Sequence, residues 1–186
     1  MQTTYEMEIA GVKRNLPLFP VNENLTIAAL IIFGDVELTV KSAGELLKKA
    51  PEFDIMLTAE AKSIPLIHEM ARQAGVNKYI VARKGEKVYM KDPLSVEVNS
   101  ITTKNTQKLF IDANDAALLR GHRVLIIDDV ISTGESLNAL EHLVNEAGGN
   151  IVGKMAILAE GEAADRDDLI FLEKLPLFHP DGTIME

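Results

Sequence analysis

Short apolar runs alternate with amphipathic segments along most of this chain. Runs of strand length occur at Leu25–Phe33, Phe53–Leu57, Lys78–Ala82, Gln107–Asp112, Val124–Ile127 and Ile151–Leu158. Helical apolar spacing occupies Asp35–Lys49, Ile64–Ala74 and Leu137–Leu143, and a short helical turn is predicted at Ala116–Leu119. Strands that alternate with helices in this way predict a parallel sheet with helices on both faces.

Two regions depart from this alternation. Tyr5–Pro20 is predicted to be extended, with a turn at Ala10-Gly11, and Pro17 limits pairing there. Arg83–Ile101 is polar and charged, which is typical of a hairpin or a mobile loop. The sequence Leu-Pro-Leu-Phe occurs twice, at 16–19 and 175–178. Chance explains so short a repeat, and one hypothesis is that both copies pack together as a lid.

The segment Val124–Ser136 has the most specific pattern in the chain. Its continuous apolar start predicts a strand buried on both faces. Asp128 and Asp129 follow where that strand leaves the core, and a Ser/Thr/Gly turn then leads into a helix. Carboxylates can accept hydrogen bonds from vicinal hydroxyls, and loop amides at a helix start can hold a phosphate. The segment therefore predicts a site for a ribose 5-phosphate.

A simpler interpretation applies to part of this segment. Ser132-Thr133-Gly134-Glu135 also matches a helix capping box, which would need no ligand. Capping does not explain two adjacent acids at a strand end, where like charges repel and desolvation adds a cost. Ligands usually bind at such strand ends in open parallel sheets.

The same segment resembles the phosphoribosyl-pyrophosphate signature of the type I phosphoribosyltransferases, and the resemblance extends over roughly Pro51 to Leu158. Within that family the chain is most similar to the adenine and xanthine enzymes. The resemblance implies an α/β fold, with a twisted parallel sheet flanked by helices and a small hood. We expect one domain over residues 1–186, with a core at about 35–160 and hood segments at about 1–34 and 161–186.

The resemblance also implies roles for individual residues. Asp128 and Asp129 would hold the ribose hydroxyls and stabilise positive charge on the ring, as the catalytic pair. The 5-phosphate loop would consist of Ile131, Ser132, Thr133, Gly134, Glu135 and Ser136. The pyrophosphate would be bound by Ala61, Lys62, Ser63, Arg83, Lys84 and Lys87.

The predicted pyrophosphate loop, Thr58–Ser63, departs from the family pattern. Adenine-type relatives usually have glycines and often an arginine there, whereas this loop has Ala59, Ala61 and Ser63, with Lys62 as its one cation. Glycine lets the backbone approach a ligand closely. Its absence is therefore expected to weaken the contact with the diphosphate, which leaves open whether the loop supports turnover. The alternative for Lys62 is a solvated surface lysine.

The implied reaction is displacement of pyrophosphate from phosphoribosyl pyrophosphate by a purine, with adenine as first choice and xanthine or hypoxanthine next. Mg²⁺ would be bound mainly through the substrate, so we expect no dedicated protein ligands for it. The base would lie under a hood built from Lys13–Pro20 and Leu175–Pro180, against Ile64 or Val130. The sequence leaves the acceptor base and its contacts open.

Composition narrows the class of protein. The net charge of −9, without a basic patch, argues against nucleic-acid binding. The chain has no cysteine, which excludes disulfides and zinc–thiolate sites and fits a reducing cytoplasm. We expect no signal peptide and no membrane span, since Leu25–Phe33 is too short to cross a bilayer. The four histidines lack metal-ligand spacing. The resemblance implies a homodimer.

Three other functions stay open at this point. The first is a non-catalytic regulatory protein that binds phosphoribosyl pyrophosphate or a nucleotide. The second is a scaffold that kept only the fold, and the third is a transferase with a non-purine acceptor. The altered pyrophosphate loop favours the first. The intact acid pair and phosphate loop argue against the second.

Overall fold

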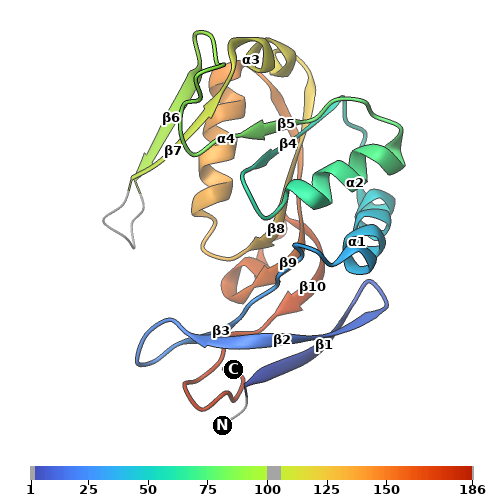
Figure 1. The fold of residues 1–186 in the computed structure, drawn as a ribbon, viewed down its shortest axis with the longest axis vertical. Coiled ribbons are helices and arrows are strands. Elements are labelled where there is room, and N and C mark those ends of the chain that lie inside the picture. The colour runs from blue at the N-terminus through green and yellow to red at the C-terminus, as the bar shows by residue number, and fades with distance from the viewer. Residues whose placement is uncertain (1–2, 100–105, 186) are drawn as a thin grey trace.

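The computed structural model describes residues 3–99 and 106–185 as an α/β core with a small antiparallel sheet at one end (Figure 1). The strands are β1 (Thr4–Ile9), β2 (Val12–Pro20), β3 (Thr26–Ala28), β4 (Ile55–Ala59), β5 (Ile80–Ala82), β6 (Leu94–Asn99), β7 (Thr106–Ile111), β8 (Arg123–Ile131), β9 (Asn150–Glu160) and β10 (Ile170–Leu175). The helices are α1 (Val36–Lys49), α2 (Ile64–Ala74), α3 (Ala113–Leu119), α4 (Glu135–Ala147) and the short 3-10 helix η1 (Gly161–Asp165).

The core sheet consists of five parallel strands in the order β10-β9-β8-β4-β5. Numbered by their appearance in the chain, these strands run 2-1-3-4-5 from β5 to β10, so the order reverses between β4 and β8. At such a switch point the connections that follow two neighbouring strands go to opposite faces of the sheet, and a crevice opens between them. The topology therefore places a ligand site beyond the ends of β4 and β8.

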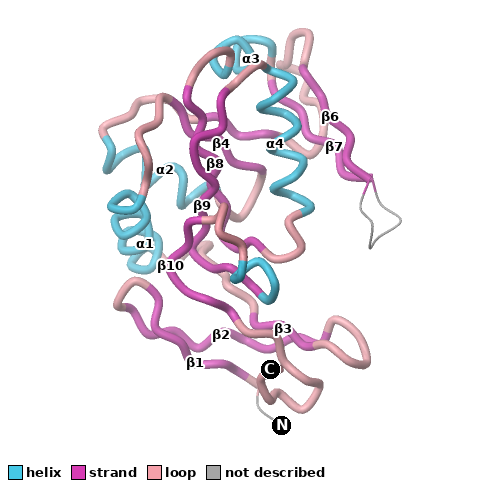
Figure 2. Tube along the Cα trace, turned by 180° about the vertical axis from the view of Figure 1, so that it is seen from behind, coloured by secondary structure: helices cyan, strands magenta, loops and turns pink. Residues whose placement is uncertain are grey.

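Helices cover both faces of this sheet, as the sequence predicts (Figure 2). On one face α1 and α2 pack through Leu38, Leu46, Leu66 and Met70. On the other face α4 packs through Leu137, Leu140 and Leu143. The strands between them are almost completely buried, which explains their continuous apolar sequences. The predicted fold class is confirmed.

Several predicted helix boundaries agree with the structure. Asp35 caps α1, because its carboxylate accepts a hydrogen bond from the backbone N–H of Leu38 at 3.1 Å. Gly75 ends α2 in the left-handed conformation, with a φ of 69°. None of the helices in residues 3–99 and 106–185 is both long and apolar enough to span a bilayer.

The predicted strand at Leu25–Phe33 is wrong in its extent. Only Thr26–Ala28 pairs with a neighbour, in β3. The next amide, of Ala29, still donates to the carbonyl of Pro17 at 2.9 Å. Pro17 has no N–H to return the bond, so the ladder ends there.

Two other segments are more ordered than the sequence indicates. Within Arg83–Ile101 the hairpin alternative is confirmed for β6, which pairs with β7; residues 100 and 101 lie outside the described residues. The strand β10 is not predicted from the sequence, and it lies beyond the expected core at the edge of the main sheet. Its three half-buried apolar residues are followed by the exposed pair Glu173-Lys174, which interrupts the apolar pattern of a sheet strand before the buried Leu175.

The small sheet of β1, β2 and β3 and the C-terminal segment pack against the end of the core, and we call them together the hood. Phe178 links the two parts: its backbone exchanges hydrogen bonds with Thr26 at 2.9 and 3.0 Å, and its ring lies edge-on to Tyr5 at 5.1 Å. Leu16 and Leu175, from the two Leu-Pro-Leu-Phe copies, belong to the same hydrophobic cluster as Phe178. The two copies thus pack around one cluster.

The last residues of the two copies give a matched stability test, because Phe178 is fully buried whereas Phe19 is 51% exposed. We expect Phe178→Ala to lower the free energy of unfolding by about 3–5 kcal/mol, from lost burial and a cavity. Phe19→Ala should change it by no more than about 0.5 kcal/mol. Urea unfolding measures both, and equal losses would contradict the packing described.

Candidate functional site

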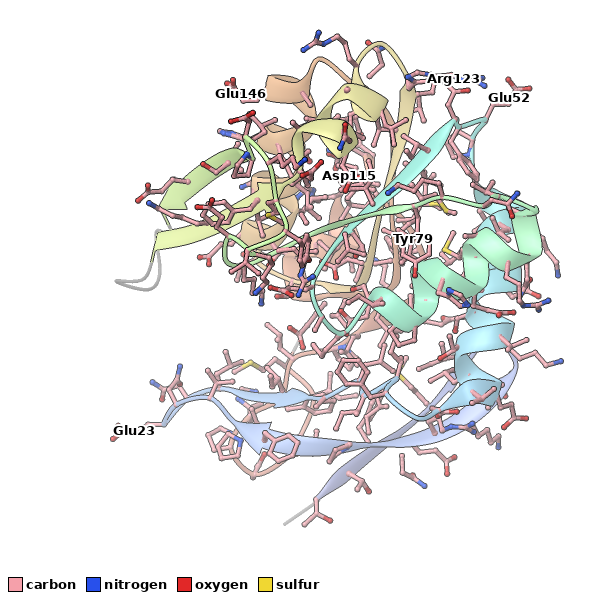
Figure 3. All side chains as sticks on the ribbon, turned by 45° about the horizontal axis from the view of Figure 1, so that its top comes forward. Glu23, Glu52, Tyr79, Asp115, Arg123 and Glu146 are labelled. Atoms are coloured by element: carbon pink, nitrogen blue, oxygen red, sulfur yellow. The ribbon has the colours of Figure 1, made fainter. Side chains whose placement is uncertain are left out.

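The strand ends that form the switch point lie toward the hood. Glu52 and Arg123, at the opposite end of the molecule from the hood, mark the starts of β4 and β8 (Figure 3). Arg123 there bonds Glu52 at 2.7 Å and Asp54 at 2.8 Å, so its charge is used where the strands begin. The carboxyl ends of both strands, and the loops after them, therefore meet on the side that faces the hood.

Asp128 and Asp129 lie at this meeting point, and Ser63 at the start of α2 holds them together. The hydroxyl oxygen of Ser63 lies 2.6 Å from Asp128 Oδ1 and 3.2 Å from Asp129 Oδ1, and it accepts the backbone N–H of Asp129 at 2.9 Å. The Nζ of Lys62 lies 3.2 Å from Asp129 Oδ2. That buried oxygen is paired with the charge of Lys62 and accepts no further hydrogen bond among the described residues.

The two acids carry an electrostatic cost. Burial raises the pKa of Asp128, and the neighbouring charge of Asp129 raises it further, while the hydroxyl of Ser63 opposes both effects. The pKa of Asp128 reaches about 7. A carboxyl group that resists ionisation is costly to maintain, which is typical of functional sites.

The loop after β4 forms one wall of a hollow of about 180 Å³ beside this acid pair. The hollow is lined by Ala59, Glu60, Ala61, Lys62, Ser63, Lys84, Leu109, Asp128, Asp129, Val130 and Ser136. Its cations are Lys62 and Lys84.

Glu60 contacts three residues that the sequence analysis assigns to a pyrophosphate. Its carboxylate accepts from Arg83 Nε at 2.6 Å and from the backbone N–H of Lys84 at 2.6 Å, and Lys87 Nζ lies 4.0 Å away. Arg83 also donates to the Tyr89 hydroxyl at 2.6 Å. Burial raises the pKa of Glu60, but the bonds from Lys84 and Arg83 outweigh it and hold that pKa below its ordinary value. Glu60 is therefore an anion inside the predicted anion site.

The loop after β8 forms a second, smaller hollow, which shares Asp128, Val130 and Ser136 with the first. Its remaining lining consists of Ile131, Ser132, Thr133, Gly134, Glu135 and Leu137. Helix α4 begins at Glu135 after Gly134, and no side chain caps it. The capping-box interpretation of Ser132 and Glu135 is therefore wrong, because Ser132 lies before the capping position.

The structure thus brings most of the predicted site residues into two connected hollows. Ala61, Lys62, Ser63, Lys84 and both aspartates line the first, and the whole predicted phosphate loop lines the second. Arg83 and Lys87 lie beside them, against Glu60. The sequence analysis missed Glu60 and Leu109. The sequence shows that Glu60 lies in the loop after β4. It does not show that Glu60 pairs with Arg83, which is 23 residues away.

A divalent cation finds few protein ligands here. Among the described residues no group of three or more His, Asp or Glu side chains is placed to hold a metal ion. The carboxylate oxygens of Asp129 and the adjacent Asp128 are hard oxygen donors of the kind that suits Mg²⁺ bound mostly through water or substrate oxygens.

Comparison with known proteins gives consistent matches. The phosphoribosyl transferase domain family matches residues 38–175. An adenine phosphoribosyltransferase of Corynebacterium jeikeium is 33% identical over 139 residues, which is 74% of this chain and 64% of that protein. A purine biosynthesis transcriptional repressor, PurR of Bacillus subtilis, is 28% identical over 114 residues, which is 61% of this chain and 39% of the repressor. The chain thus spans less than two thirds of both relatives.

Solved structures share the fold. The crystal structure of an adenine phosphoribosyltransferase from Thermoanaerobacter pseudethanolicus has a TM-score of 0.66 at 24% identity, covering 92% of this chain and 95% of that one. The yeast adenine phosphoribosyltransferase, from Saccharomyces cerevisiae, has a TM-score of 0.65 at 19% identity, covering 92% of each chain.

The raised pKa of Asp128 predicts a pH-dependent stability effect. A carboxyl group whose pKa is higher in the folded than in the unfolded protein favours folding while protonated, and this stability is lost as the pH rises from the unfolded value of 3.8 to the folded value of about 7. Asp128→Asn removes that loss and keeps an acceptor for Ser63. We expect the variant to melt about 2–4 °C above the wild type at pH 8, for a gain of about 1 kcal/mol.

Thermal unfolding at pH 8 and pH 5 measures this effect. The gap between variant and wild type should shrink at pH 5, where the wild-type side chain is largely protonated in the folded protein. A variant that is less stable than the wild type at pH 8 would contradict the assignment of electrostatic cost to Asp128.

Proposed function

This chain belongs to the phosphoribosyltransferase family, and from that membership we propose that it is a purine phosphoribosyltransferase of purine salvage. It would transfer phosphoribose from phosphoribosyl pyrophosphate to a purine, with adenine as first choice, and release pyrophosphate. One observation carries the proposal: Asp128 lines both of two connected hollows, beside Asp129, and one hollow holds Lys62 and Lys84 while the other is formed by the Ser/Thr/Gly loop at the start of α4. The substrate has this shape, with ribose hydroxyls between two phosphate groups.

The acid pair would position the ribose and stabilise its developing charge. Asp128 and Asp129 would accept hydrogen bonds from the 2- and 3-hydroxyls, and Asp129 Oδ2 would do so beside its ion-pair partner Lys62. Departure of pyrophosphate leaves positive charge on the ring, as in glycoside cleavage. Fixed carboxylates near that charge lower its energy without forming a covalent bond.

The 5-phosphate would be bound by the loop Ile131–Ser136. Hydroxyls of Ser132, Thr133 and Ser136 and the amides at the start of α4 are the donors available there. Held at this point, the ribose can present its anomeric carbon to a base above Val130. That placement converts a reaction between two molecules into one between bound groups.

The pyrophosphate would be bound in the first hollow by Ala61, Lys62, Ser63 and Lys84. Arg83 and Lys87 would join them when their contacts with Glu60 give way. Mg²⁺, when bound with the substrate, would neutralise part of the diphosphate charge. We further propose a cytoplasmic homodimer with one domain over residues 1–186, in which the hood covers the base.

A non-catalytic regulator is the second candidate. Two observations favour it: the similarity to a repressor of purine biosynthesis and the anionic Glu60 in the pyrophosphate loop. The net charge of −9 argues against a DNA-binding surface on this chain. A regulator would bind phosphoribosyl pyrophosphate and leave it intact.

Pyrophosphate release decides between these candidates. Purified protein is mixed with phosphoribosyl pyrophosphate, Mg²⁺ and adenine, hypoxanthine, guanine or xanthine in turn. We expect release with adenine. Binding of phosphoribosyl pyrophosphate without release from any base would support the regulator.

The acid pair is tested by Asp128→Asn combined with Asp129→Asn. We expect turnover to fall by at least about 10³-fold, since two charges near the ring are lost, while the protein stays folded by circular dichroism. Asp115→Asn is the matched control, because Asp115 lies on α3 and pairs with Lys78 at 2.8 Å (Figure 3). Unchanged turnover in the double variant would refute the catalytic role.

The role of Glu60 is tested by Glu60→Gln. Removing the negative charge leaves Arg83 and Lys87 free to bind the diphosphate, so we expect pyrophosphate to bind about 3- to 10-fold more tightly at low ionic strength. Glu86→Gln, an exposed change in the adjacent loop, should have little effect. Isothermal titration calorimetry measures both affinities, and weaker binding to Glu60→Gln would show that Glu60 holds the cations in place for the ligand.

A further inference from the structure

Arg166 follows η1 and lies against the phosphate loop from a distant part of the chain. Its Nε and Nη2 donate to the carboxylate of Asp168 at 2.9 and 2.8 Å. Its third nitrogen, Nη1, lies 3.1 Å from the position that a Cβ at Gly134 would occupy. One edge of the guanidinium is thus bound by Asp168, and the opposite corner lies close to the loop at Gly134.

The backbone favours glycine at position 134, and the nearby guanidinium leaves little room for a larger residue. The φ of Gly134 is 80°, in the region that other residues rarely adopt. A side chain there would also displace the guanidinium. The loop conformation and the position of Arg166 are therefore coupled.

The positive charge of Arg166 matters because the phosphate loop contains no positively charged side chain. Ile131–Ser136 contains Glu135 and no lysine or arginine. Asp128 lines the same hollow. A bound phosphate dianion would meet two carboxylates, and loop amides alone would have to offset their repulsion.

A second ion pair keeps Arg166 in this position. Lys154 on β9 binds both Asp168 and Glu141, the latter at 2.8 Å. Lys154 is only 15% exposed, so this support is well shielded from solvent. Arg166 and Lys154 thus face two carboxylates, those of Asp168 and Glu141, which hold the guanidinium in a fixed ion-pair network.

We propose that Arg166 is a positioning residue for the 5-phosphate, which braces the loop at Gly134 and supplies the positive charge that the loop lacks. It acts through the loop, since it is not among the residues that line the hollow. This proposal rests on the proposed function of the loop. The proposal concerns binding of the 5-phosphate and not of the pyrophosphate.

The test compares Arg166→Met with Arg166→Lys by calorimetry, using ribose 5-phosphate and pyrophosphate as separate probes. We expect Arg166→Met to bind ribose 5-phosphate about 10-fold more weakly at low ionic strength, and to bind pyrophosphate within about 2-fold of the wild type. Arg166→Lys restores the charge without the second bond to Asp168, so its loss should be about 3-fold. High salt should narrow all these differences.

Arg72→Met is the matched control. Arg72 also donates Nε and Nη2 to one carboxylate, that of Glu69, both at 2.8 Å, but it lies on the surface of α2. It should bind both probes like the wild type. Thermal unfolding of every variant reports any loss of stability.

Each outcome decides the proposal. Equal losses in Arg166→Met and Arg166→Lys, equal losses for both probes, or no loss at all would overturn it. Wild-type protein that does not bind ribose 5-phosphate would overturn the proposed function as well. Wild-type protein that binds it without turning over any base would overturn the catalytic proposal and leave the role of Arg166 to be decided by the variants.

Discussion

Parallel pairing of β4 with β8 is the constraint on which the rest of this structure depends. The register that joins Ile55 to Val124 and Leu57 to Ile126 fixes where both strands end. From there the chain turns to α2 on one face and to α4 on the other. The loops diverge, and the space between them becomes the site. Ser63 on one loop and the acid pair on the other strand then close the base of that space with hydrogen bonds.

Two of the three acidic side chains discussed in this space are paired with a cation without a ligand. Lys62 lies beside Asp129, and Arg83 lies against Glu60, so each buried or half-buried anion has a cation nearby except Asp128. Asp128 has no such cation among the described residues, and its burial beside Asp129 raises its pKa. A diphosphate with its metal ion would exchange partners within this set, and ribose hydroxyls would satisfy the acids. The protein therefore maintains an arrangement that costs stability and that its ligands would relieve.

The sequence predicts the parts of this molecule that depend on local pattern. The buried strand β8, the acid pair after it and the helices α1 and α2 are visible as apolar periods with end signals. β10 was missed because an edge strand needs to be apolar on one face only, and the extent of Leu25–Phe33 was overestimated because Pro17, far along the chain, ends its ladder. The contact of Glu60 with Arg83 and that of Arg166 with Gly134 join segments that only the folded chain brings together. No local pattern carries such information.

The similarity to both an enzyme and a repressor shows why the pyrophosphate loop matters more than the phosphate loop for function. A fold does not determine an activity, and the relatives of this chain include both an adenine phosphoribosyltransferase and a transcriptional repressor of purine biosynthesis. What separates them is the release of pyrophosphate. Under the proposed function, a loop without glycine and with Glu60 inside it would bind the diphosphate less tightly in the ground state, and weaker ground-state binding does not by itself slow a reaction. It would shorten the time for which the product stays bound, and product release limits many enzymes. The departure from the family pattern is thus compatible with turnover, provided that the charge of Arg83 is free to act when the diphosphate bond to the ribose breaks.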